Sequence, residues 1–278
     1  FEEYIANYLP WAPRSWLRLF ARRASRKLCH DVDHLIVPSQ QMAGVLDGYG
    51  ITTPRTVLPT GIDLNEFAGG SGARFREQHG IAADRPTLVT VSRLAMEKNI
   101  GFLLNVVKRL VVEFPSLLFI VAGEGPDAVR LKKLAASLGL QDNVLFVGNL
   151  DRRTTLLDCY RAGDAFVFAS PTETQGLVLI EAMALGVPIV STAVMGTATV
   201  LRDTRSARIS EENVDPFATH VAQLLRSSDE RLALSHAGPI DAQAWSTEGL
   251  MRRVVGLYAG LAATAGGSGA RADAIAAE

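Results

Sequence analysis

The sequence predicts an α/β protein built on a doubly wound parallel sheet, and three observations support this prediction. Short runs such as TLVTV, LLFIV, VLFVG and AFVFA are apolar and rich in β-branched and aromatic residues, as strands buried on both faces are. Helical patterns separate these runs, and Gly or Pro marks many of the boundaries. Because strand and helix alternate, we expect the strands to lie parallel in a Rossmann-like sheet with helices over both faces.

Composition narrows the class of protein. The 278 residues suffice for one large or two ordinary domains with a substantial core. A formal net charge of −1 gives no indication of a nucleic-acid partner. Cys29 and Cys159 stand far apart, so we expect two reduced thiols rather than a metal or redox pair. No apolar run is long enough to span a bilayer and no signal peptide is evident, which predicts a cytoplasmic protein.

A basic helix is predicted near the start of the chain, between Pro13 and Cys29. From Arg14 to Lys27 it carries six basic residues and no acidic one. The opposing apolar stripe consists of Leu17, Ala21, Ala24 and Leu28, with Trp16 and Phe20 at its edge. This pattern fits a helix lying on an anionic membrane surface, and it fits equally a helix packed on its own domain with a solvated charged face. The chain opens with FEEYIANYLPWAP and no initiating Met, so we expect it to be the later part of a longer protein.

The next elements follow in order. Residues 33–39 predict a strand, and the helix after it is capped by Ser39 and closes near Gly48 or Gly50. A short strand from Arg55 leads to a Pro-Thr-Gly turn, and a Gly-rich segment and a short helix follow. Regular strand–helix units then occupy residues 87–115, 116–140, 143–163 and 165–186, with one more strand over 188–193. From Asp215 onward the chain is predicted to be helical.

The stretch from Ala165 to Ala193 contains the most informative residues. A buried strand ends in a polar loop, and Gly176 opens a helix that is apolar nearly all round. Glu181 lies inside this helix, where a carboxylate needs partners. It is either paired with backbone amides or an Arg, or it accepts hydrogen bonds from ligand hydroxyls such as a ribose diol. Glu173 lies in the loop, at the sheet edge where open α/β sheets bind ligands, and the amides of Gly176 and Leu177 suit a phosphate.

Two cations follow the first strand of the regular alternation. Arg93 and Lys98 come after TLVTV, at the same carboxyl edge of the sheet, where both could grip a phosphate. Taken singly, each would more often be a solvated surface charge. At the end of the next strand, the glycines of GEGP let backbone approach a ligand closely. Gly123 and Glu124 are the candidate binding residues there.

The segment ETQGLVLIEAMALGVPIV resembles the signature of the family-four retaining glycosyltransferases, also called group 1 glycosyltransferases, which have the GT-B fold and use nucleotide sugars. The resemblance implies that Glu173 contacts the donor sugar, that Glu181 binds the nucleotide ribose, and that the Gly176 and Leu177 amides hold the diphosphate. It also implies that Arg93 and Lys98 bind the phosphate and stabilise its negative charge as it leaves. Further contacts to the nucleotide are implied near Gly123 and Glu124, and backbone contacts to the base at Gly148, Asn149 and Leu150. The common pattern has Gly-Phe where this chain has Thr174 and Gln175, and this variant resembles a bacterial subset that includes diacylglycerol glucosyltransferases.

The same resemblance implies a domain organisation. Residues 1–60 would be the remnant of the acceptor domain and the crossover, and residues 61–244 the nucleotide-sugar donor domain. Residues 245–262 would form a helix that returns to the first domain. The tail over 263–278, rich in Ala and Gly, is predicted to be disordered.

The sequence therefore predicts a retaining hexosyltransferase that moves a hexose from a UDP- or GDP-sugar to an acceptor, in the form of a membrane lipid or a glycan. Phosphate handling by Arg, Lys and amides predicts that no metal and no cofactor is needed. The alternative is a non-catalytic nucleotide-sugar-binding domain or subunit, and a chain lacking the acceptor domain is expected to be inactive. An unrelated Rossmann-like oxidoreductase is disfavoured because no Gly-x-Gly-x-x-Gly opens the first helix. We expect a cytoplasmic location, with the Arg14–Lys27 helix as a peripheral contact to anionic membrane.

Overall fold

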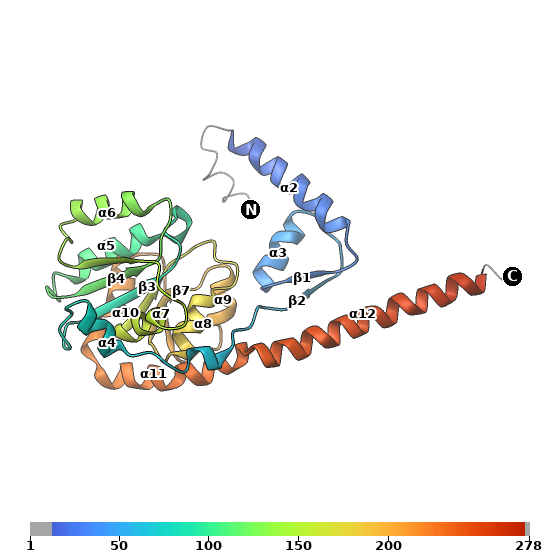
Figure 1. The fold of residues 1–278 in the computed structure, drawn as a ribbon. Coiled ribbons are helices and arrows are strands. Elements are labelled where there is room, and N and C mark those ends of the chain that lie inside the picture. Colours follow the sequence, from blue (N-terminus) through green and yellow to red (C-terminus); the bar gives the residue numbers. More distant parts are fainter. Residues whose placement is uncertain (1–12, 276–278) are drawn as a thin grey trace.

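Six parallel strands form the central sheet of the larger part of the molecule, in a computed structural model that describes residues 13–275 (Figure 1). The strands are Thr87–Val91 (β3), Leu118–Ala122 (β4), Val144–Gly148 (β5), Ala165–Phe168 (β6), Ile189–Thr192 (β7) and Ala207–Ser210 (β8). Their spatial order is β5-β4-β3-β6-β7-β8. The order reverses between β3 and β6, which pair through Leu88–Ala165 and Val89–Phe166. The α/β fold with a doubly wound parallel sheet is therefore confirmed.

Helices cover both faces of this sheet because successive strand residues point to opposite sides. The helices are Gly72–Gln78 (α4), Ile100–Leu110 (α5), Ala128–Ser137 (α6), Thr155–Ala162 (α7), Leu177–Ala184 (α8), Gly196–Leu201 (α9), Val214–Arg226 (α10) and Ser228–Ala242 (α11). Leu88 packs in a core with α5, α6 and α10, whereas the next residue, Val89, packs in a second core with α4, α7 and α8. Short 3-10 turns lie at Leu64–Phe67 (η1), Met96–Lys98 (η2) and Gln243–Trp245 (η3).

The smaller part of the molecule comprises the basic helix and one strand–helix–strand unit. Its elements are Arg14–His30 (α2), Leu35–Val37 (β1), Gln40–Gly48 (α3) and Arg55–Val57 (β2). The strands pair in parallel, and the Ser39 hydroxyl caps α3 by accepting from the Met42 amide at 3.2 Å, as predicted. In α2, one residue of the predicted apolar stripe, Ala21, is buried, and another, Leu28, is 70% exposed.

The chain crosses between the two parts twice, and the two crossings lie side by side. Ile62 and Ser246 form an isolated parallel bridge, in which the Ile62 amide donates to the Trp245 carbonyl at 3.0 Å. A side chain of the sheet domain, that of Gln175, forms hydrogen bonds with the backbone of the first crossing at Thr60. The Thr60 amide donates to Gln175 Oε1 at 2.8 Å, and Gln175 Nε2 donates to the Thr60 carbonyl at 2.5 Å. The predicted boundary at residue 60 falls at this contact.

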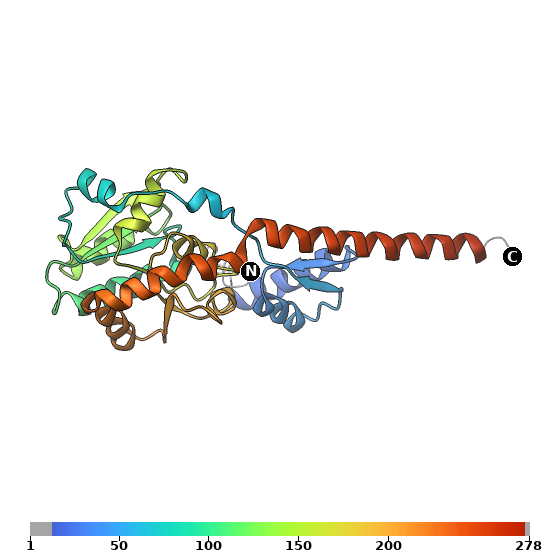
Figure 2. The same ribbon diagram turned by 90° about the horizontal axis from the view of Figure 1, so that it is seen from below.

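After the second crossing, Thr247–Ile275 form one long helix, α12. Figure 2 shows it leaving the sheet domain and running past the β1–β2 pair, where Arg253 donates to the Val57 carbonyl at 3.3 Å. α12 includes residues 263–275 of the segment for which the sequence predicted a tail. Residues 276–278 lie outside the described residues, as does the opening segment 1–12.

Candidate functional site

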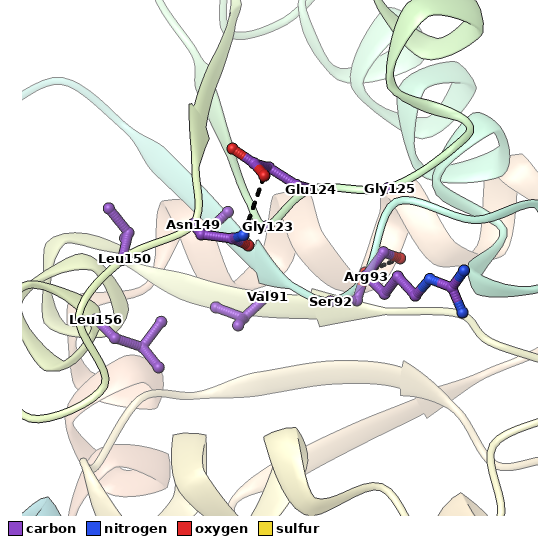
Figure 3. A pocket seen from close by; sticks show the side chains of 10 residues that line it. Val91, Ser92, Arg93, Gly123, Glu124, Gly125, Asn149, Leu150 and Leu156 are labelled. Atoms are coloured by element: carbon purple, nitrogen blue, oxygen red, sulfur yellow. Dashed lines mark hydrogen bonds between the residues drawn. The ribbon is translucent and has the colours of Figure 1, made fainter.

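A cavity of about 570 Å³ lies at the carboxyl ends of three neighbouring strands, β3, β4 and β5 (Figure 3). The polar residues among its lining are Ser92, Arg93, Glu124 and Asn149, and its apolar wall includes Val91, Leu150 and Leu156. Glu124 and Asn149 are joined across it, because Asn149 Nδ2 donates to Glu124 Oε2 at 3.1 Å. In Figure 3 the Arg93 side chain extends away from Asn149 and Leu150. Arg93, Gly123, Glu124, Asn149 and Leu150, predicted from separate strand ends, thus line one cavity.

Glycine is required in the wall of this cavity. Gly123 has φ +121, and a Cβ added there would lie 2.0 Å from the Ser92 carbonyl oxygen. Such an atom would overlap backbone that belongs to the neighbouring strand end, so only glycine fits. Gly148 at the end of β5 is also in the left-handed region, with φ +69, and a Cβ there would lie 3.4 Å from Glu124 Oε1. Gly148 is thus placed next to the cavity without being one of its lining residues.

Lys98 reaches across the point where the strand order reverses. It follows β3, and its Nζ lies 2.6 Å from Oε2 of Glu173, which follows β6. The turn that carries Lys98 depends on Asn99, which adopts φ 55 and donates through Nδ2 to the Ala169 carbonyl at 3.3 Å and to Glu212 Oε1 at 2.9 Å. The cation predicted after the first strand therefore lies beside the loop that carries the first glutamate.

The loop containing Glu173 and the start of α8 form one wall of a second cavity, of about 440 Å³. Gly176 precedes α8 with φ +91, a conformation that a residue with a side chain rarely adopts. The opposite wall comes from the smaller part of the molecule and includes Ile36, Pro38 and Leu58. The predicted residues Glu173, Thr174, Gln175, Gly176 and Leu177 all line this cavity, which lies between the two parts of the chain.

Glu181 is buried within α8, with its side chain 3% exposed, and both of its oxygens have partners. Arg152 Nη2 lies 2.5 Å from Oε1, and the Tyr160 hydroxyl donates to Oε2 at 2.8 Å. Burial and the adjacent Glu181 charge hold the pKa of Tyr160 well above its usual range, so the phenol keeps its proton and remains a donor. The Arg pairing that the sequence left open for Glu181 is present, and contact with a ligand hydroxyl stays a prediction.

Three residues next to the predicted set were not found from the sequence. Arg152 and Tyr160 lie 29 and 21 residues before Glu181, on the loop after β5 and on α7. Asn99 carried a weak signal, because Asn is one of the few residues that enters the left-handed region readily. Only the packing of α7 against α8 brings Tyr160 to Glu181, and no local pattern encodes that contact.

Comparison with protein families gives two matches. The model described as glycosyl transferases group 1 matches residues 72–240, and the model described as glycosyltransferase family 4 matches residues 3–66. The first covers all the predicted site residues. The two matches divide the chain near the first crossing, between residues 66 and 72.

Relatives with assigned names cover the same region. The chain is 36% identical to "Alpha-monoglucosyldiacylglycerol synthase" of Streptococcus pneumoniae over 171 residues, which is 60% of this chain and 38% of that protein. It is 34% identical to "D-inositol 3-phosphate glycosyltransferase" of Geodermatophilus obscurus over 239 residues, 82% of this chain and 52% of that protein. The chain thus spans about half the length, or less, of these relatives.

Solved structures share the fold at lower identity. A sucrose-phosphate synthase from Thermosynechococcus elongatus superposes with a TM-score of 0.80 at 24% identity, covering 94% of this chain and 66% of that one. Anabaena HepE in complex with UDP and glucose gives a TM-score of 0.74 at 18% identity, covering 86% and 66%. At these identities the likeness shows the fold.

Proposed function

The chain belongs to the group 1 glycosyltransferases, and on that premise we propose that it binds the nucleoside diphosphate sugar for a retaining hexosyl transfer to a lipid or glycan acceptor. The observation that carries the proposal is the Lys98–Glu173 contact across the reversal point of the sheet. It places a cation and a carboxylate beside the Gly176 turn, at the edge where open α/β sheets bind ligands. The cation and the amides would bind a diphosphate, and the carboxylate would accept a hydrogen bond from a sugar hydroxyl.

Each proposed contact has a place in this arrangement. The nucleobase occupies the cavity at the ends of β3, β4 and β5, beside Glu124 and Asn149. The ribose lies against Glu181, and the diphosphate against the amides of Gly176 and Leu177. The hexose lies next to Glu173. Four contacts along one sheet edge would then follow the order of base, ribose, diphosphate and sugar in the donor.

The reaction we propose depends on charge stabilisation. When the bond between hexose and phosphate breaks, negative charge grows on the leaving phosphate. Lys98, together with Arg93 and the α8 amides, would hold that charge more tightly than it holds the intact donor. With these groups in place the transfer would need neither a metal ion nor a cofactor. Retention would follow if the acceptor hydroxyl attacks from the face that the phosphate leaves, with the phosphate taking its proton.

A panel of donors tests the proposal. UDP-glucose, GDP-mannose, ADP-glucose and the free diphosphates are titrated into the chain by calorimetry and by thermal shift. A ligand bound to the folded state alone stabilises it by about 2.7 kcal/mol at one hundred times its Kd, so one base should raise the melting temperature well above the others. A shift of equal size for all of them, or none, would contradict the proposal.

The acceptor is proposed to be a lipid-linked molecule, and α2 is proposed to contact the anionic cytoplasmic face of a membrane. Trp16, Leu19 and Phe20 share one face of α2 and are 77%, 51% and 69% exposed. Arg23 and Lys27 continue that face at helical spacing, which suits acidic headgroups around inserted aromatic rings. No described helix is both long and apolar enough to cross a bilayer. We propose a peripheral contact through this face of α2.

Flotation with liposomes tests the membrane contact. The chain should float with vesicles that contain phosphatidylglycerol and less with pure phosphatidylcholine. A double variant, Trp16→Ser with Phe20→Ser, should lose most of the binding, whereas Val112→Ser, which removes a similarly exposed apolar residue from the turn after α5, should not. Equal flotation with both lipids would remove this part of the proposal.

The alternative is a module that binds a nucleotide sugar without transferring it, and the short span relative to the relatives favours testing it. Donor binding without hydrolysis or transfer is expected of this chain if the acceptor domain is lacking. Assay of a version that covers the full length of the relatives separates the two. Turnover there identifies a transferase, and binding without turnover there identifies a binding module.

A further inference from the structure

One carboxylate oxygen of Glu181 contacts a buried side chain, and the other contacts an exposed one. Tyr160, on Oε2, is fully buried, and its ring lies 5.3 Å from that of Phe166, a residue of the β6 core. Arg152, on Oε1, has a side chain that is 62% exposed. A ligand arriving from solvent can displace the second partner and cannot displace the first.

The location of Arg152 also permits it to move. It lies on the loop between β5 and α7, which borders the Asn149–Leu150 side of the large cavity. The guanidinium is mostly in contact with water, so water can solvate it when it leaves the carboxylate. The Arg152–Glu181 contact is therefore exchangeable. The Tyr160 hydrogen bond has no such freedom, because the buried phenol has no water to replace Glu181.

We propose that Arg152 guards the ribose subsite: its guanidinium occupies Glu181 Oε1 until a ribose hydroxyl replaces it, while Tyr160 keeps Oε2 fixed. This inference rests on the proposed function, since it concerns the carboxylate that would hold the ribose. Tyr160 is then a positioning residue, and Arg152 determines how much of the Glu181 contact the ribose gains on binding.

The guard has a measurable consequence for sugar recognition. In the unaltered chain, the hydrogen bond gained from a ribose hydroxyl is offset by the loss of the Arg152 contact. A nucleotide without the hydroxyls neither gains the first nor breaks the second. The chain should therefore distinguish ribose from dideoxyribose only weakly, and removal of Arg152 should sharpen the distinction.

Calorimetry on the chain measures this with uridine and guanosine diphosphates and their 2′,3′-dideoxy forms. The ratio of the Kd of the dideoxy form to that of the ribose form should rise about tenfold or more in Arg152→Ala, as expected when a charge-assisted hydrogen bond no longer has to be broken. Because both forms carry the same diphosphate, any effect of the lost charge on phosphate binding cancels in the ratio. Arg153→Ala removes the same charge one residue along and should leave the ratio unchanged.

Tyr160→Phe gives the second measurement. It keeps the ring in the core and removes only the donor to Oε2, so the fold should persist. Added to Arg152→Ala, it should bring the raised ratio several-fold back toward one. A ratio in Arg152→Ala that equals or lies below that of the unaltered chain would overturn the guard. If neither diphosphate binds the unaltered chain at all, the proposed function itself fails, which is a different result from tight binding with an unchanged ratio.

Discussion

Lys98 and Glu173 form an ion pair, with 2.6 Å between Nζ and Oε2. Both side chains are mostly buried, at 21% and 17% exposed, and they come from loops that follow different strands. A donor phosphate would compete with Glu173 for the ammonium, and a sugar hydroxyl would compete with Lys98 for the carboxylate. We therefore expect the ion pair to open when the donor binds, with Lys98 contacting the phosphate and Glu173 contacting the sugar hydroxyl.

Lys98→Ala tests this at the level of one residue. Because we propose that Lys98 stabilises the leaving phosphate, the variant should lower kcat about 100-fold or more, as loss of one preorganised donor typically does. The Kd for the donor should change much less. Steady-state transfer by the full-length enzyme, together with donor titration, gives both numbers.

Lys108→Ala, on the exposed face of α5, is the matched control and should leave both numbers unchanged. A fall in affinity as large as the fall in kcat would show that Lys98 binds substrate and transition state equally, and the catalytic role would have to be dropped.

Cys159 gives a prediction that is independent of any ligand. Burial raises the pKa of this thiol to about 12, and the charge of the adjacent Asp158 adds to the shift. In the folded chain it should therefore resist iodoacetamide up to about pH 11, and in denaturant it should react readily near pH 9. Mass spectrometry of peptides identifies the labelled residue, with the partly exposed Cys29 as an internal reference.

The sign of the linked stability change follows from the raised pKa. Between its unfolded pKa near 9 and its folded value of about 12, the unfolded chain loses the Cys159 proton and the folded chain keeps it. Stability is then lost as pH rises through this interval. Rapid labelling of native Cys159 at pH 8 would contradict the burial that the structure gives it.

At the level of elements, the loop after β4 requires glycine at position 123, where there is no room for a side chain. Gly123→Ala would place a Cβ 2.0 Å from the Ser92 carbonyl oxygen, at a φ of +121. We expect a loss of about 2 kcal/mol or more in the free energy of unfolding, because backbone must shift and the residue is strained. Urea denaturation followed by circular dichroism measures it.

Gly101→Ala serves as the comparison within the same sheet domain. In α5 an added Cβ meets nothing nearer than 3.5 Å, so alanine should be neutral or stabilise by about 0.5 kcal/mol. If the two substitutions change the urea midpoint equally, the close approach at Gly123 does not constrain the loop.

The sequence predicted the elements with strong periodicity and missed two with weak signals. Strands β3 to β7 were expected because each is a short apolar run with β-branched or aromatic residues. The edge strand β8, with the sequence ARIS, has an Arg and a half-exposed Ile, and the short α9 before it has no amphipathic pattern. Only Ala207 and Ser210 of β8 are buried, so the strand lacks the continuous apolar run that identified the others.

Prediction of the site followed the same rule. Residues at strand ends, such as Lys98 and Glu173, could be placed at one sheet edge because parallel strands end on the same side. The contacts of Arg152 and Tyr160 with Glu181 could not be predicted, because they depend on how α7 packs on α8. Where α12 ends depended on a tail of Ala and Gly whose composition favours neither helix nor coil strongly.

At the level of the whole molecule, one side chain ties the two parts together. Gln175 pairs with both peptide groups of Thr60, at 2.8 and 2.5 Å, and is 6% exposed. Thr199 and Gln41 add a second contact at 2.5 Å between the same two parts. The loop that lines the donor-side wall of the smaller cavity is thus fixed to the first crossing.

Gln175→Leu should release this crossing. The Thr60 amide then loses its acceptor, and we expect its hydrogen exchange to become at least tenfold faster. Exchange measured by NMR at single residues decides this. The Leu58 amide, which donates to the Val37 carbonyl at 2.8 Å, is the internal control and should keep its protection. Unchanged exchange at Thr60 would show that something else holds the crossing.

The contact between Gln175 and Thr60 constrains the residue types at positions 60 and 175 to different degrees. The carboxamide bonds only to the backbone N–H and C=O of residue 60, and every amino acid except proline supplies both. The contact therefore does not depend on the side chain at position 60. Position 60 can drift among related sequences without opening the joint. A sequence with Phe at position 175, as in the common pattern, cannot form this joint, because only a carboxamide of this length offers both an acceptor and a donor to the backbone of residue 60.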